Sequence, residues 1–288
     1  MCNKRQLAEW GRQSLTRRSF GAATITAGAT AACAPMDANM GSGSTNLAET
    51  SVSFATSAGT MDGFFVHPSD GKHAPVLFWP DIAGLREAKR QMARRLARQG
   101  YAVFVANPYY RDVTGEQFAD FATFAAQDGF QKVKPWREKL DAAAIGVDAS
   151  AVAQWFAGQD AVDPDRRMGT QGYCMGGPFT IWSAAAVPRL EAAASFHGGG
   201  LVRDGENSPH RMLREPVHYL IAIAQDDDAE SPNAKTELRQ AADRVGCEAE
   251  IDVYPADHGW CVPDSPAYNE AQAERAWSRL LAIYSDAL

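Results

Sequence analysis

The sequence predicts an α/β fold, in which a mostly parallel sheet is covered by helices on both faces. Short, continuously apolar runs such as 75–79 and 101–106 alternate along the chain with longer amphipathic runs. The strands of a parallel sheet are buried on both faces, so they are apolar throughout, and the helices that connect them are amphipathic. Ligands of such sheets bind at the carboxyl ends of the strands, which directs the search for a site to the loops that follow them.

Composition bounds the function as well as the fold. With 288 residues, of which 45% are hydrophobic and 22% charged, the chain can bury one substantial core and is too short for two ordinary enzyme domains plus a leader. The formal net charge of −7 argues against a nucleic-acid partner, because phosphate binding requires a basic face. One basic cluster has helical spacing and predicts a solvated helix face. It comprises Arg86, Lys89, Arg90, Arg94, Arg95 and Arg98.

Residues 1–34 have the features of an export signal. Arg17 and Arg18 precede an alanine-rich run at 21–32 that is too short and too weakly apolar to span a bilayer permanently. This arrangement resembles a twin-arginine signal peptide, which implies a bacterial protein that the Tat machinery exports to the periplasm or beyond. The alternative is an amphipathic or disordered N-terminus.

The end of this leader is compatible with two modes of processing. Residues 30–33, Thr-Ala-Ala-Cys, loosely resemble a lipoprotein cleavage box, and the Gly/Ser/Asn-rich stretch 37–46 would suit a flexible tether from a lipid anchor at Cys33. Thr30 stands where a larger aliphatic residue is usual, so ordinary cleavage nearby is the other interpretation. The expected organisation is a signal peptide at 1–34, a flexible linker at 35–50 and a folded domain at 51–288.

The folded domain is expected to begin with an antiparallel hairpin and to continue with alternating strands and helices. Runs of β-type residues at 52–54 and 63–66 predict the hairpin. The remaining strands are predicted at 75–79, 101–106, 168–171, 192–196, 217–224 and 249–254, and the helices at 85–99, 137–156, 178–187, 233–245 and 267–284. The buried face of the long helix is predicted to consist of Leu140, Ala144, Val147, Ala151 and Trp155.

The stretch 172–177 carries the most specific chemical signal. It reads Gly-x-Cys-x-Gly between a predicted strand and a predicted helix, which is the pattern of a nucleophile elbow with a thiol in place of the usual hydroxyl. On so sharp a turn, a β-carbon at Gly172 or Gly176 would collide with neighbouring backbone. Cys174 is therefore expected at a helix N-terminus, which favours its thiolate, with the amide of Met175 directed at a developing oxyanion. The alternative is a buried structural cysteine on a glycine-rich turn.

Two strand-end loops supply a base and an acid for this nucleophile. The strand at 249–254 runs into His258, and the strand before it runs into three consecutive aspartates. The chain order Cys, Asp, His is that of an α/β-hydrolase sheet. The small-x-x-Asp turn that is usual after the earlier strand selects Asp227 as the acid, with Asp226 and Asp228 as alternatives.

His197 begins a glycine-rich turn after the predicted strand at 192–196. The turn looks like the oxyanion loop of lipases, but that loop belongs before the nucleophile and this one follows it. We expect His197 either to contact the substrate or only to border the pocket. The other histidines of the folded domain do not suit a base, and they are His67, His73, His210 and His218.

Three segments together resemble the dienelactone hydrolase family of α/β-hydrolases. They are Gly-Tyr-Cys-Met-Gly-Gly at 172–177, Gln-Gly-Tyr-Ala-Val at 99–103 followed by Asn-Pro-Tyr-Tyr, and the Tyr-Pro and His-Gly pairs within 254–259. The similarity covers about residue 60 to the C-terminus.

This resemblance implies a hydrolase with a catalytic triad of Cys174, His258 and Asp227. Its oxyanion would be held by the amide of Met175 and by the amide of Ile82, which lies in the loop after the first core strand. Asp81 falls where members of the family often carry a glutamate that contacts the thiol. A role in holding or activating the nucleophile is therefore open to Asp81.

The sequence departs from the family pattern where the substrate would be recognised. Members that cleave dienelactone itself carry an arginine shortly after the histidine, which clamps the substrate carboxylate, whereas 259–262 contains none. A cation could come instead from Arg111 or Arg137, and the candidate substrate contacts are Trp260, His197 and Arg111. The expected substrate is a less acidic ester or lactone. Four aromatic residues form either a pocket wall or a cap that packs on the core, and they are Phe118, Phe121, Phe124 and Trp136.

Two classes of function follow from these observations. The first is a hydrolase of carboxylic ester or lactone bonds that needs no cofactor. A metal site is not expected, because the sequence has no C-x-x-C pair and no His/Cys spacing that suits zinc. The second is a non-catalytic exported or lipid-anchored binding protein on the same fold. An activated thiol at Cys174 would separate the first class from the second.

Overall fold

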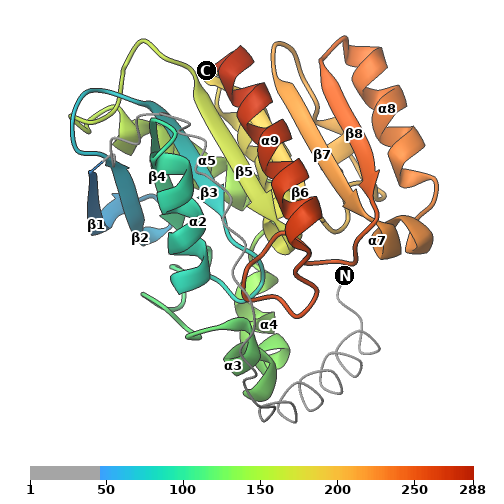
Figure 1. Ribbon diagram of the computed structural model, residues 1–288, viewed down its shortest axis with the longest axis horizontal. Helices are drawn as coiled ribbons and strands as arrows, with labels where there is room; N and C mark the ends of the chain where they lie inside the picture. Colours follow the sequence, from blue (N-terminus) through green and yellow to red (C-terminus); the bar gives the residue numbers. More distant parts are fainter. Residues whose placement is uncertain (1–45) are drawn as a thin grey trace, which may run out of the picture.

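The computed structural model of the protein describes residues 46–288 (Figure 1). In this part of the chain, one eight-stranded sheet has the order β1-β2-β4-β3-β5-β6-β7-β8. β1 and β2 form an antiparallel hairpin, β2 pairs antiparallel with β4, and the other neighbours are parallel. The strands are Leu47–Thr56 (β1), Gly59–Pro68 (β2), Ala74–Trp79 (β3), Tyr101–Ala106 (β4), Met168–Tyr173 (β5), Leu190–Phe196 (β6), His218–Ala224 (β7) and Ala249–Tyr254 (β8). The predicted, mostly parallel sheet is confirmed.

Helices cover both faces of this sheet. α2 and α9 lie on the face that is toward the viewer in Figure 1, and α5, α6 and α8 pack on the other face. The helices are Glu87–Ala97 (α2), Phe121–Ala126 (α3), Gly129–Arg137 (α4), Ala142–Phe156 (α5), Gly177–Ala186 (α6), Gln225–Glu230 (α7), Ala234–Val245 (α8) and Glu270–Ala287 (α9), with short 3-10 turns at Cys174–Gly176 (η2) and Pro209–Arg211 (η3). Of these, α3, α4 and α7 lie outside the predicted helices, because short helices contain too few turns to show a clear apolar period.

The long helix predicted at 137–156 starts later than predicted, because Arg137 is the last residue of α4 and the next four residues are not helical. α4 ends at Arg137, and α5 begins after Asp141, whose side chain accepts a hydrogen bond from the amide of Ala144 (2.8 Å) and caps the new helix. Of the predicted buried face, Leu140 is buried, whereas the positions predicted within α5 are wrong, since Val147 is 42% exposed. The buried set is Ala142, Ile145, Asp148, Ala149, Val152 and Phe156. The sequence did not reveal this buried face because it contains Asp148, and an acidic residue ordinarily indicates a solvated position.

The folded part of the chain begins earlier than predicted. β1 starts at Leu47, where the linker was expected, because its first residues pair with the end of β2 (Leu47 opposite Pro68). The predicted signal peptide, Cys33 and most of the predicted linker lie outside the described residues.

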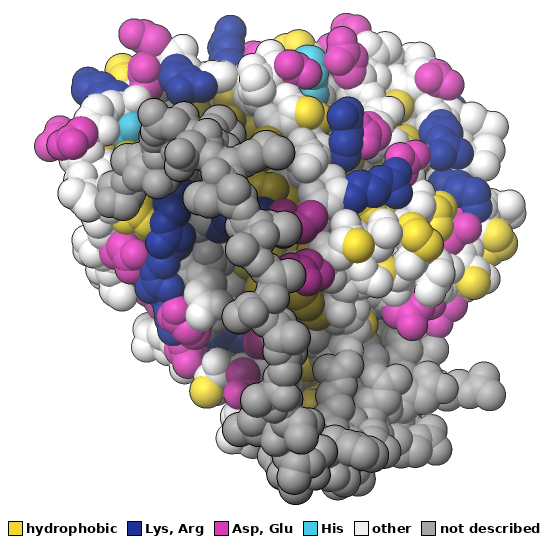
Figure 2. Space-filling view, in the orientation of Figure 1, with side chains coloured by type: hydrophobic (Ala, Val, Ile, Leu, Met, Phe, Trp, Pro, Cys, Tyr) yellow, Lys and Arg dark blue, Asp and Glu magenta, His cyan; other side chains and the backbone are white. Residues whose placement is uncertain are grey.

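Charges of both signs are interspersed on the face shown in Figure 2. Surface ion pairs join Arg94 to Glu49 (Nε–Oε1 2.8 Å) and Arg95 to Glu274 (Nη2–Oε2 2.6 Å). Exposed pairs of this kind contribute about 0–1 kcal/mol each. Within residues 46–288, no helix combines the length and the apolar character that crossing a membrane requires.

Candidate active site

Cys174 stands on a sharp turn between β5 and α6. Its backbone φ is 53°, in the left-handed region that residues other than glycine rarely adopt, and η2 then leads directly into α6. A β-carbon at Gly172 would lie 2.0 Å from the carbonyl oxygen of Gly176, and one at Gly176 would lie 2.6 Å from that of Pro80. The predicted collision is confirmed at both glycines, so the turn requires them.

His258 and Asp227 meet at the carboxyl edge of the sheet. Asp227 lies in α7, directly after β7, and His258 lies in the loop after β8, the neighbouring parallel strand. His258 Nδ1 is 2.7 Å from Asp227 Oδ2. The adjacent aspartates are differently engaged: Asp226 accepts a hydrogen bond from the His258 amide (2.9 Å), and Asp228 accepts two from Lys235 Nζ (2.6 and 2.8 Å). Of the three candidate acids, Asp227 is therefore the partner of the imidazole.

The imidazole of His258 is also linked to Cys174. The histidine is only 3% exposed, and burial by itself lowers its pKa. The charge of Cys174 and the hydrogen bonds with Asp227 and Cys174 outweigh burial, and they raise the pKa of His258 well above its ordinary value. Because Asp227 holds Nδ1, Nε2 is the nitrogen that remains for the thiol. The site therefore favours a protonated His258 beside a negatively charged sulfur.

The loop after β3 places Asp81 and Ile82 in the wall of the same pocket. Asp81 accepts hydrogen bonds from Arg86 at both oxygens (Nη1–Oδ1 2.8 Å, Nη2–Oδ2 2.9 Å), and Lys89 Nζ lies 2.7 Å from Oδ2. Burial opposes ionisation, yet these two cations hold the pKa of Asp81 well below its usual range. Asp81 is thus a buried carboxylate with a cation at each oxygen, and its predicted action on the thiol stays a prediction.

The predicted solvated face of α2 is wrong at two positions. Arg86 and Lys89 are fully buried, whereas the side chains of Arg94 and Arg95 are 23% and 43% exposed. Helical spacing showed that these residues share a side of the helix. It could not show that the carboxylate of Asp81, in the preceding loop, lies against that side of the helix. Because Asp81 pairs with both cations, their burial costs less free energy.

Arg86 also joins this loop to two further segments around the pocket. Its Nε and Nη2 donate to Asp264 (2.7 and 2.8 Å), which lies in the loop after β8. Asp264 Oδ2 in turn accepts a hydrogen bond from the amide of Phe121 (2.9 Å), the first residue of α3. One buried guanidinium therefore holds together the loop after β3, the loop that carries His258, and the cap helix α3.

The pocket itself gathers most of the predicted site residues. Its lining consists of Asp81, Ile82, Phe121, Cys174, His197, His258, Gly259, Val262 and Ser265. Trp260 is not among them: it is fully buried behind His197, with the two ring centroids 5.1 Å apart. Of the cap aromatics, Phe121 belongs to the wall, whereas Phe118 and Phe124 pack on each other with centroids 5.0 Å apart.

Arg111 lies outside this pocket, so its prediction as a substrate contact is corrected. Its Nη1 and Nη2 donate to the two oxygens of Asp148 (2.8 and 2.7 Å), and Tyr110 Oη donates to the same carboxylate (2.6 Å). Asp148 is fully buried in α5, where an unpaired charge would be strongly destabilising. Arg111 therefore neutralises a core carboxylate rather than facing the substrate.

Tyr109 ties the two predicted oxyanion segments together, and the sequence analysis missed it. Its hydroxyl donates to the carbonyl oxygen of Ile82 (2.8 Å) and lies 3.4 Å from Met175 Sδ. The residue is 1% exposed and follows β4. Its position at a strand end, within the Asn-Pro-Tyr-Tyr motif, is the signal that could have identified it.

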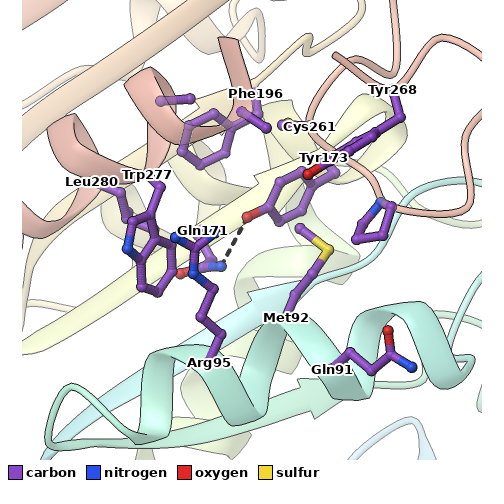
Figure 3. A pocket seen from close by; sticks show the side chains of 13 residues that line it. Gln91, Met92, Arg95, Gln171, Tyr173, Phe196, Cys261, Tyr268, Trp277 and Leu280 are labelled. Atoms are coloured by element: carbon purple, nitrogen blue, oxygen red, sulfur yellow. Dashed lines mark hydrogen bonds between the residues drawn. The ribbon is translucent and has the colours of Figure 1, made fainter. Parts of the chain in front are cut away.

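A larger pocket of about 180 Å³ lies between α2 and α9 (Figure 3). Its walls are mostly apolar and include Met92, Tyr173 and Trp277, whereas Cys174 and His258 do not line it. Cys261 also lines it, but burial raises the pKa of that thiol, which keeps it protonated. The candidate active site is therefore the pocket at Cys174. The described residues contain no group of three or more His, Cys, Asp or Glu side chains that could hold a metal ion.

The fold and the elbow together define an α/β-hydrolase. A model of the dienelactone hydrolase family matches residues 61–288, and the chain belongs to that family. A protein of Salmonella typhi, provisionally named a carboxymethylenebutenolidase, is 32% identical over 234 residues, which are 78% of this chain and 82% of that protein. The corresponding protein of Escherichia coli K12 is also 32% identical, over 77% of this chain and 80% of that one.

Solved structures give the same family. A crystal structure from Klebsiella pneumoniae, provisionally titled a dienelactone hydrolase, is 27% identical with a TM-score of 0.67, and the match covers 83% of this chain and 99% of that one. The protein is accordingly a hydrolase that acts on lactone or ester bonds.

Proposed function

We propose that this protein hydrolyses uncharged carboxylic esters or lactones with Cys174 as nucleophile, His258 as base and acid, and Asp227 as the residue that orients the imidazole. The observation that carries the proposal is the hydrogen bond between Asp227 and the buried His258, whose pKa the neighbouring Cys174 raises in the same pocket; Cys174 itself stands on a strained turn at the start of a helix. An acid, a base and a nucleophile joined in this order are the arrangement that acyl transfer requires.

The reaction needs only groups of the chain and a water molecule. The Cys174 thiolate attacks the carbonyl carbon, and the amides of Met175 and Ile82 stabilise the oxyanion that forms. Collapse of this intermediate expels the alcohol, which takes a proton from His258, and leaves a thioester on Cys174. Water then attacks the thioester and gives its proton to His258, and the acid is released as the thiolate returns. No cofactor enters these steps.

The charge of the pocket supports a neutral substrate. Among the described residues that line it, none is lysine or arginine. Asp81 is the acidic residue of the wall, and its oxygens face Arg86 and Lys89. A substrate carboxylate would therefore lose water and find no lysine or arginine in the wall, and the imidazolium of His258 is already paired with Asp227, which disfavours binding of the carboxylate.

Alkylation tests the proposed pair of thiolate and imidazolium. Cys174 is expected to react rapidly with iodoacetamide near neutral pH, whereas an ordinary thiol, with a pKa of about 8.5, reacts slowly there. Cys247 provides an internal control, because burial raises the pKa of its thiol. The imidazolium should persist until the pH rises through the raised pKa of His258, and His258→Ala should give Cys174 the profile of an ordinary thiol. A wild-type profile that already resembles an ordinary cysteine would count against the proposal.

We further propose that residues 1–34 are a twin-arginine export signal and that the mature protein acts in the bacterial periplasm or beyond. The Arg17-Arg18 pair ahead of a weakly apolar run supports it. Replacing both arginines with lysine is expected to retain the protein in the cytoplasm, as fractionation would show, and unchanged export would contradict the proposal. Attachment of lipid at Cys33, the alternative to simple cleavage, would be lost in Cys33→Ala.

A further inference from the structure

His197 sits at the end of β6 in a conformation that the surrounding backbone enforces. Its φ is 40°, in the left-handed region, where a residue other than glycine is strained by about 1–3 kcal/mol. Its amide donates to the carbonyl oxygen of Ala222 (2.8 Å). Gly198 is confined as well, since a β-carbon there would lie 2.4 Å from Ser195 Oγ. The strained turn therefore has little freedom, and it holds the imidazole in one place.

That place is the wall of the pocket, directly beside His258. The ring of His197 meets that of His258 edge to face, with centroids 4.7 Å apart and an interplanar angle of 61°. Trp260 covers it from behind, with centroids 5.1 Å apart. His197 is only 1% exposed, so this part of the pocket wall is shielded from bulk solvent.

Neither ring nitrogen of His197 has a hydrogen-bond partner among the other described residues. A buried polar group that stays unpaired costs about 1–3 kcal/mol, so such groups usually have a function or a transient partner. Burial, together with the charge of His258, holds the pKa of His197 well below its ordinary value. The imidazole is therefore neutral and offers one N–H donor and one acceptor nitrogen, which suits a hydroxyl group or a water molecule.

Given the proposed hydrolysis, we propose that His197 hydrogen-bonds the oxygen that lies between the acyl carbon and His258. This oxygen belongs to the departing alcohol when the thioester forms and to the attacking water when the thioester breaks. Both occupy the same position, because His258 protonates the first and takes the proton of the second. The edge contact between the two imidazoles places the second ring beside that position.

The second half of the reaction should depend on His197 more than the first. The departing oxygen is positioned by its own covalent bond to the acyl carbon. The attacking water has no such bond, and it is oriented only by hydrogen bonds before it forms the new C–O bond and passes its proton to His258. Without His197, the thioester on Cys174 should therefore accumulate.

The test compares variants that distinguish the contribution of the aromatic ring from that of its hydrogen-bonding nitrogens. His197→Phe keeps an aromatic ring and removes both hydrogen-bonding atoms, whereas His197→Asn removes the ring and keeps a donor and an acceptor. Asparagine also tolerates the left-handed backbone. The probe is p-nitrophenyl acetate, followed from milliseconds so that release of nitrophenol in the first turnover is resolved from the steady state.

For the phenylalanine variant we expect a burst of about one nitrophenol per active site, and then turnover about two- to tenfold slower than wild type, which is the effect of losing one hydrogen bond between neutral groups. Hydroxylamine, which attacks the thioester without an oriented water, should restore turnover. His197→Asn should show no such burst. If the phenylalanine variant does not fold, His197→Gly, which relieves the backbone strain and lacks the nitrogens, takes its place in the same comparison.

Two results would overturn the role of His197. One is deacylation at the wild-type rate in the variants that lack the nitrogens. The other is an equal loss in both phases in the asparagine, phenylalanine and glycine variants alike, which would show a packing role. Failure of the proposed function looks different, because wild-type protein would then hydrolyse the probe no faster than His258→Ala, whatever stands at position 197.

Discussion

Replacing His258 with alanine is expected to lower kcat/KM for a simple ester by about a thousandfold or more, with the fold intact. The loss is large because this residue supplies both the proton for the alcohol and the base for water. Asp227→Asn should follow with a smaller but still severe loss, since Nδ1 of His258 would no longer face a carboxylate at 2.7 Å.

The neighbouring aspartate is the matched control for these variants. Asp228→Asn removes the same charge one residue away, but it affects the contact with Lys235 rather than the imidazole. It should stay within about threefold of wild type. Steady-state hydrolysis of one neutral ester by the three purified variants, with circular dichroism to verify folding, makes the comparison. Similar losses in the 227 and 228 variants would reject Asp227 as the orienting acid.

The second large effect is expected from Arg86→Gln. The guanidinium is fully buried and donates to Asp81, Asp264 and the carbonyl oxygen of Gly84, so its removal leaves buried oxygens without their cation. Breaking a buried ion pair in this way costs about 3–5 kcal/mol. In a domain of this size, that loss lowers Tm by roughly 6 °C or more.

Arg95→Gln, on the same helix, is the control for this prediction. Its partner Glu274 is half exposed, as Arg95 is, so the pair should contribute about 1 kcal/mol or less. Thermal unfolding of both variants gives the comparison. Equal shifts in Tm would contradict the stabilising role of the buried ion pairs of Arg86. Activity provides a second readout, because Phe121 and Ile82 line the pocket on segments that Arg86 holds.

Much of the site could be predicted from local sequence. The Gly-x-Cys-x-Gly stretch prescribes its own backbone, since a side chain at Gly172 or Gly176 would overlap backbone oxygens. The positions of His258 and the aspartates followed from the rule that strand-end loops share one edge of a parallel sheet. These inferences needed only the order of strands along the chain.

What the sequence could not reveal depends on contacts between distant segments. Arg86 and Lys89 carry the pattern of an exposed helix face, and only the fold brings Asp81 against them. Likewise, Asp148 interrupts the apolar face of α5 in the sequence, and only the fold shows that Arg111, from the loop after β4, pairs with it. In both cases hydrophobic periodicity predicts the wrong buried face. The desolvation cost of the buried charge is offset by a partner that lies far away in the sequence.

The most direct test of the central claim is the identity of the residue that carries the acyl group. Wild-type protein and His197→Phe are mixed with p-nitrophenyl acetate, quenched in acid within the first turnover, digested and mapped by mass spectrometry. The account predicts an acetyl group on the peptide that contains Cys174, in higher yield in the variant, and none in Cys174→Ala. Turnover without acylation of Cys174, or acetylation of a different residue in step with turnover, would contradict it.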